Sequence, residues 1–308
     1  MNNTIAVILA TYNGEKYLKQ QIESILDQTY KNIKIYIGDD CSKDGTIDII
    51  RTYKNLYPDK ITYYQNEINI GFVKNFEKLL QNTKEDYIAF SDQDDIWLPS
   101  KLEEQINKVK EIEKKSNPPI MCHSDLIMID ENHNIIYNSF FSFKKYKLKP
   151  EKDLGHILGP CGVMGNTIMI NRALKDIILP FPEGIDFHDY YIAVVCELFG
   201  KRVTFYKAFV LYRIHQDNTS NNKLYPSAYK GIPYKNTQKN ITLGAIKKYN
   251  KIKSKDLKKI NFLIEYIEKE CNFFYICFNM INYKLLKRSF IYKILFFLKM
   301  IYFTLSKK

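Results

Sequence analysis

The sequence predicts an α/β fold in which a mostly parallel central sheet is flanked by helices, with a helical extension at the C-terminus. Strand-like and helix-like segments alternate from Ile5 to Phe90, the pattern of a parallel sheet with crossover helices. The strand-like segments are short, continuous apolar runs, as expected for strands covered on both faces. Polar loops follow these runs, and ligands of open α/β sheets bind beyond the carboxyl ends of the strands.

Each element of the first half follows from its own local pattern. The segment after the first polar turn has apolar residues at Leu18, Ile22 and Ile25, which is helical spacing. Strands are predicted at Ile5–Ala10, Ile33–Ile37, Ile61–Tyr64 and Tyr87–Phe90, and helices at Tyr17–Gln28, Thr46–Tyr57 and Val73–Gln81.

Beyond Pro118-Pro119 strand-like and helix-like segments no longer alternate regularly. In this part the composition of the chain indicates the domain organisation. Here we predict strands at Ile120–Cys122, Leu126–Ile129 and Val203–Val210, and a helix at Tyr190–Phe199. A polar stretch rich in Tyr, Asn and Lys follows, and the last residues regain helical periodicity. We therefore predict a main domain over residues 1–220, a linker over 221–243 and a basic, amphipathic helical extension over 244–308.

The charge distribution argues against a nucleic-acid-binding protein. The 308 residues carry a net charge of +12, but residues 244–308 hold 15 Lys and Arg against 4 Asp and Glu, and the first 243 residues are nearly neutral. The six cysteines form no C-x-x-C pair, which argues against a zinc site and for reduced thiols in the cytosol. The N-terminus is interpreted as a first strand and not as a signal peptide.

The stretch FSDQDDIWLP places Asp92, Asp94 and Asp95 directly after a buried strand. Carboxylates this close repel one another unless a cation or hydrogen-bond donors compensate. Mg²⁺ and Mn²⁺ prefer carboxylate oxygens and complete their shells with water and substrate phosphates, so a D-x-D at a strand end suits a metal–diphosphate site. The structural alternative is an acidic helix start, with Asp95 or Ser100 as the cap.

Two other polar loops lie at the same predicted edge of the sheet. Asp39-Asp40 end the second strand, where a carboxylate can accept from a nucleobase N–H or from ribose hydroxyls. Tyr12, after the first strand, could pack beside a base. The alternatives are an ordinary turn for the first loop, since Asp, Ser and Gly favour turns, and a helix-entry loop for the second.

The motifs ATYNGEKYL, QIESILDQTY, IYIGDDCSKDGT, NIGFVKNFE, DYIAFSDQDDIWLP and HDYYI together resemble family 2 glycosyltransferases. This resemblance implies the GT-A (nucleotide-diphospho-sugar transferase) fold and an inverting, metal-dependent transfer using Mg²⁺ or Mn²⁺. The forms SDQDDIWLP and YRIHQDNTS are similar to the bacterial rhamnosyltransferase-like branch. That branch uses dTDP-rhamnose to build surface polysaccharides, while close relatives use UDP-galactose or UDP-glucose.

The resemblance also implies roles for individual residues. Asp189 in HDYYI would be the catalytic base, because displacement at the anomeric carbon needs a carboxylate to take the acceptor's proton; a helix N-cap role is compatible with this. His188 replaces the family's commoner glutamate. Asp94 would be the main metal ligand, with Asp92 nearer the ribose and His215 completing the shell. The residues expected to bind the nucleotide-sugar are Thr11, Tyr12, Asn13, Glu15, Asp40, Asn75, Asp92 and Arg213.

Three of these assignments have plain structural alternatives. Asn75 could be a surface residue on a helix, and His215 an ordinary structural histidine. Cys161-Gly162 and Gly165-Asn166 are expected in an acceptor-side loop, for which packing is an equally good explanation.

The tail suggests an interaction surface. Ser289–Leu305 is almost entirely apolar and Lys247–Lys259 is a dense run of cations, which together suit a helix lying in an anionic cytoplasmic membrane leaflet. The alternatives are a homodimer or docking face and solvated lysines around a core helix. The expected partners are thus a nucleotide-sugar donor, a glycan or glycolipid acceptor and the inner face of the plasma membrane, with no nucleic acid. A non-catalytic sugar-nucleotide or glycan-binding module remains the competing function.

Overall fold

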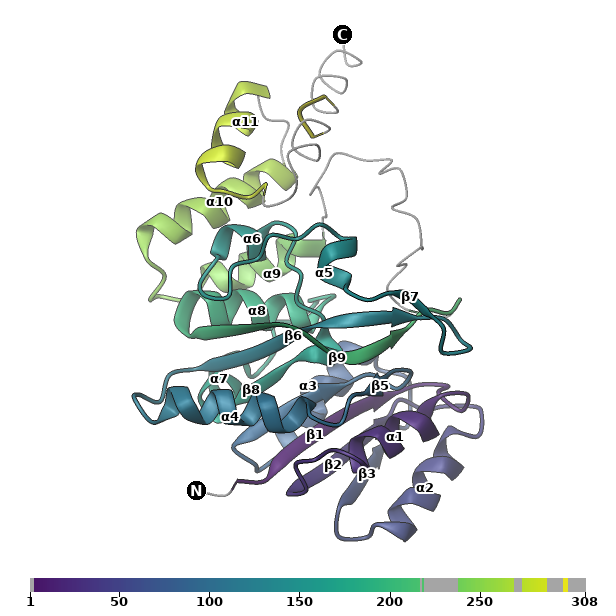
Figure 1. Cartoon of the computed structure of the whole chain (residues 1–308). Coiled ribbons are helices and arrows are strands. Elements are labelled where there is room, and N and C mark those ends of the chain that lie inside the picture. The colour runs from purple at the N-terminus through teal and green to yellow at the C-terminus, as the bar shows by residue number, and fades with distance from the viewer. Residues whose placement is uncertain (1–2, 217, 219–237, 269–272, 287–295, 299–308) are drawn as a thin grey trace.

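Nine strands form one mixed sheet in the computed structural model, which describes residues 3–216, 218, 238–268, 273–286 and 296–298 (Figure 1). The strand order is β3-β2-β1-β4-β8-β6-β9-β5, and β7 pairs with β6 beside this path. The sheet is flanked by helices, as the alternation of apolar runs and amphipathic segments predicts.

The first half of the sheet is parallel, as predicted. Its strands are β1 (Ile5–Thr11), β2 (Ile33–Asp39), β3 (Ile61–Gln65) and β4 (Tyr87–Ser91), connected by helices α1 (Leu18–Leu26), α2 (Thr46–Leu56) and α3 (Phe72–Asn82). In the register of these strands Thr11 lies beside Asp39, and Leu9 beside Ser91. The loops that follow β1, β2 and β4 therefore start at one edge of the sheet.

The second half of the sheet mixes both strand directions. Its elements are β5 (Ile96–Trp97), α4 (Lys101–Glu113), β6 (Ile120–Ile129), β7 (Ile135–Tyr137), α5 (Phe140–Phe143), α6 (Leu154–Leu158), the 3₁₀ turn η1 (Gly165–Thr167), β8 (Met169–Asn171), α7 (Arg172–Ile178), α8 (His188–Phe199) and β9 (Lys201–Arg213). Strand β8 is antiparallel to β4 and β6, whereas β6 and β9 run parallel.

The prediction of two strands between Ile120 and Ile129 is wrong, because one strand, β6, spans the whole segment. The predicted break was the polar stretch His123–Asp125, whose side chains are buried. Two of the three have partners far away in the sequence: the His123 ring hydrogen-bonds with Thr204 of β9 at 2.9 Å, and Asp125 accepts the N–H of Phe141. A buried polar group costs little once it is hydrogen-bonded, so the strand continues.

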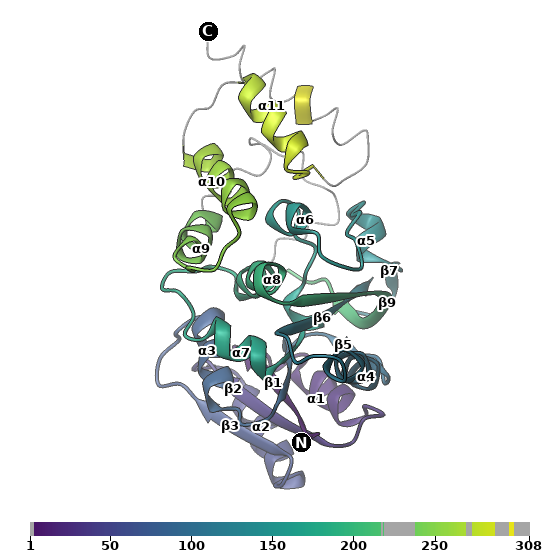
Figure 2. The ribbon, with the colours of Figure 1, turned by 90° about the vertical axis from the view of Figure 1, so that its left-hand side faces the viewer.

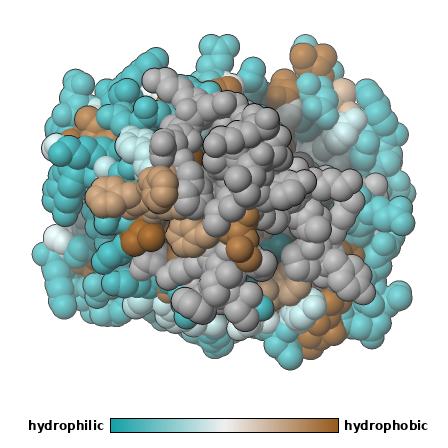
Figure 3. Space-filling model, turned by 90° about the horizontal axis from the view of Figure 1, so that it is seen from above, coloured by the Kyte–Doolittle hydropathy of each residue, from teal (hydrophilic) through white to brown (hydrophobic). Residues whose placement is uncertain are grey.

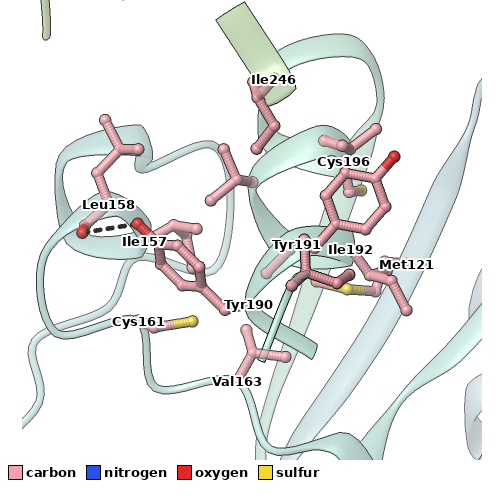
Figure 4. Packing of buried hydrophobic residues seen from close by; sticks show 14 of the residues in the cluster. Met121, Ile157, Leu158, Cys161, Val163, Tyr190, Tyr191, Ile192, Cys196 and Ile246 are labelled. Atoms are coloured by element: carbon pink, nitrogen blue, oxygen red, sulfur yellow. Dashed lines mark hydrogen bonds between the residues drawn. The ribbon is translucent and has the colours of Figure 1, made fainter. Parts of the chain in front are cut away.

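The core lies on both faces of the sheet, with alternate residues of β1 belonging to opposite sides. On one side α8 is almost entirely buried, and the segment around Cys161 and Val163 packs against it (Figure 4). The Tyr190 hydroxyl donates to the carbonyl of Leu158 at 3.1 Å. This bond ties the start of α8 to the chain that leads into η1.

Helices α9 (Gln238–Lys247), α10 (Ser254–Glu268) and α11 (Phe273–Asn282) lie beyond α8, at the end of the molecule away from β1, β2 and β3 (Figure 2). Helix α9 begins within the predicted linker, six residues before the expected start at 244. The predicted apolar helix Ser289–Leu305 lies outside the described residues except for 296–298. Among the described residues, no helix combines the length and the hydropathy needed to cross a bilayer.

One buried histidine makes the stability of the fold depend on pH. His188 is 4% exposed, and its ring lies 4.4 Å from that of Phe76 and 5.6 Å from that of Phe90. Neither ring nitrogen has a hydrogen-bond partner among the described residues. Burial away from compensating groups lowers the pKa of His188 to about 3.

We expect the free energy of unfolding to fall as the pH drops below the unfolded-state pKa of about 6.5, because only the unfolded chain then takes up the proton on this ring. Between pH 7 and 5 the loss from His188 is about 2 kcal/mol, at ~1.4 kcal/mol per pH unit. Urea denaturation of His188→Leu at both pH values should show a drop smaller by that amount. The exposed His133, as His133→Asn, is the control. A drop equal to wild type in His188→Leu would contradict the assignment.

Candidate active site

A cleft of about 730 Å³ opens at the sheet edge where β1, β2 and β4 end. Its walls come from the loops after these strands, the start of α3, the turn η1, the start of α8 and the end of β9. The predicted site residues that line it are Thr11, Tyr12, Asn13, Asp40, Asn75, Asp92, Asp94, Asp189 and His215. Residues up to 204 positions apart in the chain thus share one cavity.

The aspartate loop after β4 is held by partners on β9 and η1. Asp94 Oδ2 lies 2.8 Å from His215 Nε2, and Asn218 also reaches both side chains. Asp95 is fully buried and accepts from the side chain of Asn166 and from the N–H of Arg213. Asp95 therefore anchors the loop from beneath, while Asp94 faces the cleft.

The electrostatics of this loop favour a cation. Burial and the nearby charges of Asp94 and Asp189 raise the pKa of Asp92, and burial with the charges of Asp94 and Asp92 raises the pKa of Asp95 well above its usual range. Lys101 at the start of α4 is the buried counter-charge, with Nζ 3.4 Å from the ring centre of Trp97. Burial lowers the pKa of Lys101 despite the carboxylates nearby. The surplus of negative charge is what a bound cation relieves.

Asp189 lies in the first turn of α8, across the cleft from the aspartate loop. Its Oδ1 accepts the N–H of Tyr190 at 2.6 Å. The helix N-terminus favours the ionised carboxylate at this place. The N-cap itself is Phe187, so the suggested capping role of Asp189 is corrected to a first-turn position.

Gln93, between the two aspartates, is a site residue that the sequence analysis missed. Its Oε1 accepts from the Thr11 hydroxyl at 2.6 Å and from the N–H of Tyr12 at 2.8 Å, and its Nε2 donates to the Tyr12 carbonyl at 3.1 Å. One side-chain amide thus joins the aspartate loop to the loop after β1. Its place inside the D-x-D was the only signal in the sequence.

Asp40 and Asn75 form the wall on the α3 side. Asp40 is 2% exposed and accepts from the N–H groups of Ile70 and Gly71 at 2.9 and 2.8 Å. Asn75 is equally buried and donates to the Gly38 carbonyl at 2.7 Å. The alternative of a surface position for Asn75 is therefore wrong. Tyr12, with 44% of its surface exposed, stands at the rim of the same wall.

Two predicted site residues lie outside the cleft lining. Arg213 is fully buried, and its guanidinium donates to the carbonyl of Asp94 and to Gln20 Oε1 at 3.0 and 2.8 Å while lying 4.5 Å from the ring centre of Tyr17. Its donors are directed at protein, so it supports the aspartate loop instead of reaching into the cavity. Glu15 accepts the N–H of Gly45, the residue that precedes α2, and so closes a turn.

The donor set in the cleft fits a divalent cation that also binds a substrate diphosphate. A carboxylate, Asp94, and an imidazole, His215, lie side by side facing the cavity, with Asp92 nearby. Within the described ranges, no three His, Cys, Asp or Glu side chains are arranged to hold a metal ion by themselves. A metal–diphosphate site needs only one or two protein ligands, since phosphates and water supply the others.

Comparison with known sequences gives one matching family. The model described as Glycosyl transferase family 2 matches residues 6–172. The chain is 29% identical over 223 residues to the Escherichia coli protein UDP-Glc:alpha-D-GlcNAc-diphosphoundecaprenol beta-1,3-glucosyltransferase WfaP, covering 71% of this chain and 80% of the relative. It is 39% identical over 103 residues to the dTDP-rhamnosyl transferase RfbG of Shigella flexneri, covering 32% of this chain and 36% of that relative.

Solved structures share the fold. The structure of S. aureus TarS 1–349 in complex with UDP-GlcNAc superposes with a TM-score of 0.60 at 20% identity, covering 86% of this chain and 71% of TarS. The mannosyltransferase PcManGT from Pyrobaculum calidifontis, in complex with GDP-Man and Mn²⁺, superposes with a TM-score of 0.56 at 14% identity, covering 91% and 72%. At these identities the likeness concerns the fold, which is the predicted GT-A architecture.

Proposed function

Because the chain belongs to glycosyltransferase family 2, we propose that it transfers a sugar from a nucleotide-diphospho-sugar to a growing bacterial surface glycan, with inversion at the anomeric carbon. The observation that carries this proposal is the convergence of Asp40, Asp94 and Asp189 on one cleft of about 730 Å³. These carboxylates come from three distant parts of the chain, and we assign them to the nucleoside and the diphosphate of the donor and to the hydroxyl of the acceptor.

We assign different residues to the nucleoside, the diphosphate and the acceptor hydroxyl. Tyr12 and Asp40, with Asn75 beside them, receive the nucleoside. Mg²⁺ or Mn²⁺, when held by Asp94 and His215 with Asp92 nearby, supplies positive charge to the diphosphate leaving group. Asp189 takes the proton of the acceptor hydroxyl, so that the oxygen can attack the anomeric carbon from the face opposite the leaving nucleotide. The carboxylates around Asp92 repel the negatively charged diphosphate until the cation is present.

The donor is proposed from the relatives. The names of WfaP and RfbG give UDP-glucose and dTDP-rhamnose as their donors, and both nucleotides carry a pyrimidine. We propose a pyrimidine nucleotide-sugar, with dTDP-rhamnose favoured and UDP-glucose or UDP-galactose as the alternatives. The acceptor is proposed to be lipid-linked, as the diphosphoundecaprenol in the name of WfaP suggests for that relative.

A panel of sugar nucleotides tests this assignment. We expect Mn²⁺-dependent hydrolysis or transfer with one of dTDP-rhamnose, UDP-glucose and UDP-galactose, and slower turnover with GDP-mannose, because the donors named for both relatives carry a pyrimidine. The measurement is release of the nucleoside diphosphate with and without EDTA. Fastest turnover with a purine donor would overturn the pyrimidine assignment. Absence of turnover with every donor, with or without an acceptor, would overturn the enzyme assignment.

The C-terminal helices are proposed to bind an anionic membrane surface at the inner face of the plasma membrane. Helix α11 exposes a stripe formed by Phe274, Phe278 and Ile281, which are 79%, 67% and 60% exposed. This i, i+4, i+7 spacing places the three side chains on one face. The exposed lysines of the 251–258 segment lie on the preceding turn and helix. The end of the molecule that carries these helices shows hydrophobic residues beside hydrophilic ones (Figure 3).

We expect the double variant Phe274→Ser/Phe278→Ser to bind vesicles rich in phosphatidylglycerol about 30-fold more weakly, because two partly buried phenyl rings contribute about 2 kcal/mol. Cosedimentation with these vesicles at low and high salt measures the change. Leu56→Ser, at an exposed leucine of α2 (65% exposed), is the control. Unchanged vesicle binding together with loss of a dimer in ultracentrifugation would replace the membrane with a second copy as the partner of this face.

A further inference from the structure

A second pocket, of about 440 Å³, lies outside the cleft, between the β6–β9 pair and residues 139–148. Its wall contains the rings of Phe141, Tyr146 and Tyr206, with Asp125 at the base and Lys145 and Lys147 among the lining residues. We infer that this pocket binds an acidic sugar unit of the acceptor glycan, away from the reacting hydroxyl. This inference rests on the proposed function, because it assigns the pocket to the same acceptor.

A bulge in β9 creates the pocket. Ser124 of β6 pairs with Phe205, but the next residue, Asp125, pairs with Ala208, so Tyr206 and Lys207 have no opposite residues in the β6–β9 ladder. Bulges of this kind re-aim side chains and are frequent beside functional sites. Here Tyr206 remains 56% exposed, and its hydroxyl donates to the Leu148 carbonyl at 2.7 Å. That hydrogen bond holds the 147–148 backbone against the bulge as the opposite wall.

The chemistry of the wall suits a sugar that carries a negative charge. A pyranose ring has an apolar C–H face that packs on aromatic rings, and hydroxyl groups that need polar partners. Asp125 already accepts from the N–H groups of Leu126 and Phe141 and from the Ser139 hydroxyl, so its charge is compensated. Lys145 and Lys147 are exposed and make no ion pair with any described residue.

Lys207, the lysine in the bulge itself, differs from Lys145 and Lys147 in having an ion-pair partner. Lys207 forms an ion pair with Glu104 of α4 at 2.6 Å, so its charge is already used. The two lysines of the pocket therefore remain the cations available to a carboxylate on a ligand.

The segment from Gly162 to Gly165 connects the pocket with the active-site cleft. Gly162 lies against the Tyr146 ring so closely that a Cβ there would come within 3.1 Å of it. Two and three residues further on, Met164 and Gly165 line the cleft beside His188 and Asp189. This segment begins in the left-handed region of φ, with values of 63° at Cys161 and 83° at Gly162.

The separation along β9 suits a glycan of several units. Tyr206 in the pocket and Tyr212 in the cleft are six residues apart on the same strand, at most about 20 Å at ~3.3 Å per residue, since the bulge at Tyr206 shortens this span. A glycan whose terminal hydroxyl meets Asp189 can therefore place an earlier sugar in the pocket. The site would add affinity for an extended acceptor without touching the reacting atoms.

Saturation-transfer NMR with methyl β-glucuronide tests the inference without requiring turnover. We expect signals from the sugar ring in the full-length wild type that fall at least threefold in Tyr206→Ala/Lys147→Ala, and weaker signals from methyl β-glucoside. The matched controls are Tyr137→Ala, an exposed tyrosine on β7 (40% exposed), and Lys201→Ala, an exposed lysine on β9. Both should retain the wild-type signals.

Three results would overturn the inference: equal signals in wild type and the double variant, equal signals from glucoside and glucuronide, or full displacement of the glucuronide by an equal concentration of inorganic phosphate. Each concerns binding in the second pocket alone. Failure of the proposed function is seen separately, as absence of nucleotide release in the donor panel, so the two outcomes are distinguishable.

Discussion

Replacing Asp189 by asparagine is expected to lower the turnover number at least about 100-fold while the affinity for the donor stays within about twofold, because general-base catalysis typically contributes 10²–10⁴ in rate. Asparagine keeps the size of the side chain and can still accept the N–H of Tyr190, which Asp189 Oδ1 does at 2.6 Å. The lost property is the ability to take a proton. Nucleotide release under saturating acceptor and calorimetric titration of the donor measure the two quantities.

Asp186→Asn is the matched control, since Asp186 is a partly exposed carboxylate three residues upstream and outside the cleft lining. Turnover of Asp189→Asn within threefold of wild type would remove Asp189 from the mechanism. Donor binding with no turnover in the wild type itself would instead favour the non-catalytic sugar-nucleotide-binding module that competes with the enzyme interpretation.

The second large effect is expected at Asp94. Asp94→Asn should lower turnover about 100-fold or more, because charge stabilisation by a bound cation is worth several kcal/mol. EDTA should lower the turnover of the wild type to a similar degree, and added Mn²⁺ should restore the wild type but not the variant. The hydrogen bond between Asp94 and His215, 2.8 Å in the structure, can form with asparagine, so the fold of the loop is retained.

The control for this experiment is Asp59→Asn, at an exposed carboxylate outside the cleft lining. Full activity of the wild type in EDTA would exclude a metal requirement. Loss of activity in Asp94→Asn with normal activity of the wild type in EDTA would assign Asp94 a direct role toward the substrate.

Much of the fold was predictable, because the first four strands are uninterrupted apolar runs with little competing structure. Parallel strands place their carboxyl ends together, so Thr11, Asp40 and Asp94 could be expected in one site from element order alone. Strand β6 was not predictable in the same way. Two of the residues that seemed to interrupt it, His123 and Asp125, hydrogen-bond with Thr204 and with the N–H of Phe141, and such tertiary partners leave no local signal in the sequence.

The candidate site was less predictable in its supporting residues than in its lining. Arg213 was expected to face the diphosphate, but a guanidinium has five donors and nothing in the local sequence tells whether they meet ligand or protein. In the structure they meet the Asp94 carbonyl, Gln20 and Glu131. Glu15 closes a turn by accepting the N–H of Gly45, a role set by the distance between two loops. A sequence motif therefore identifies the acidic residues at strand ends more readily than the residues that hold their loops in place.

The amide of Gln93 gives the cleft a property that neither loop has alone. It joins the main chain of Tyr12 and the hydroxyl of Thr11 to the segment that carries Asp92 and Asp94. Any ligand that draws one of these loops inward must pull on the other, and thermodynamic linkage makes such an influence mutual. The cation and the nucleotide should therefore raise the protein's affinity for each other by the same factor, and this coupling should depend on the side chain of Gln93.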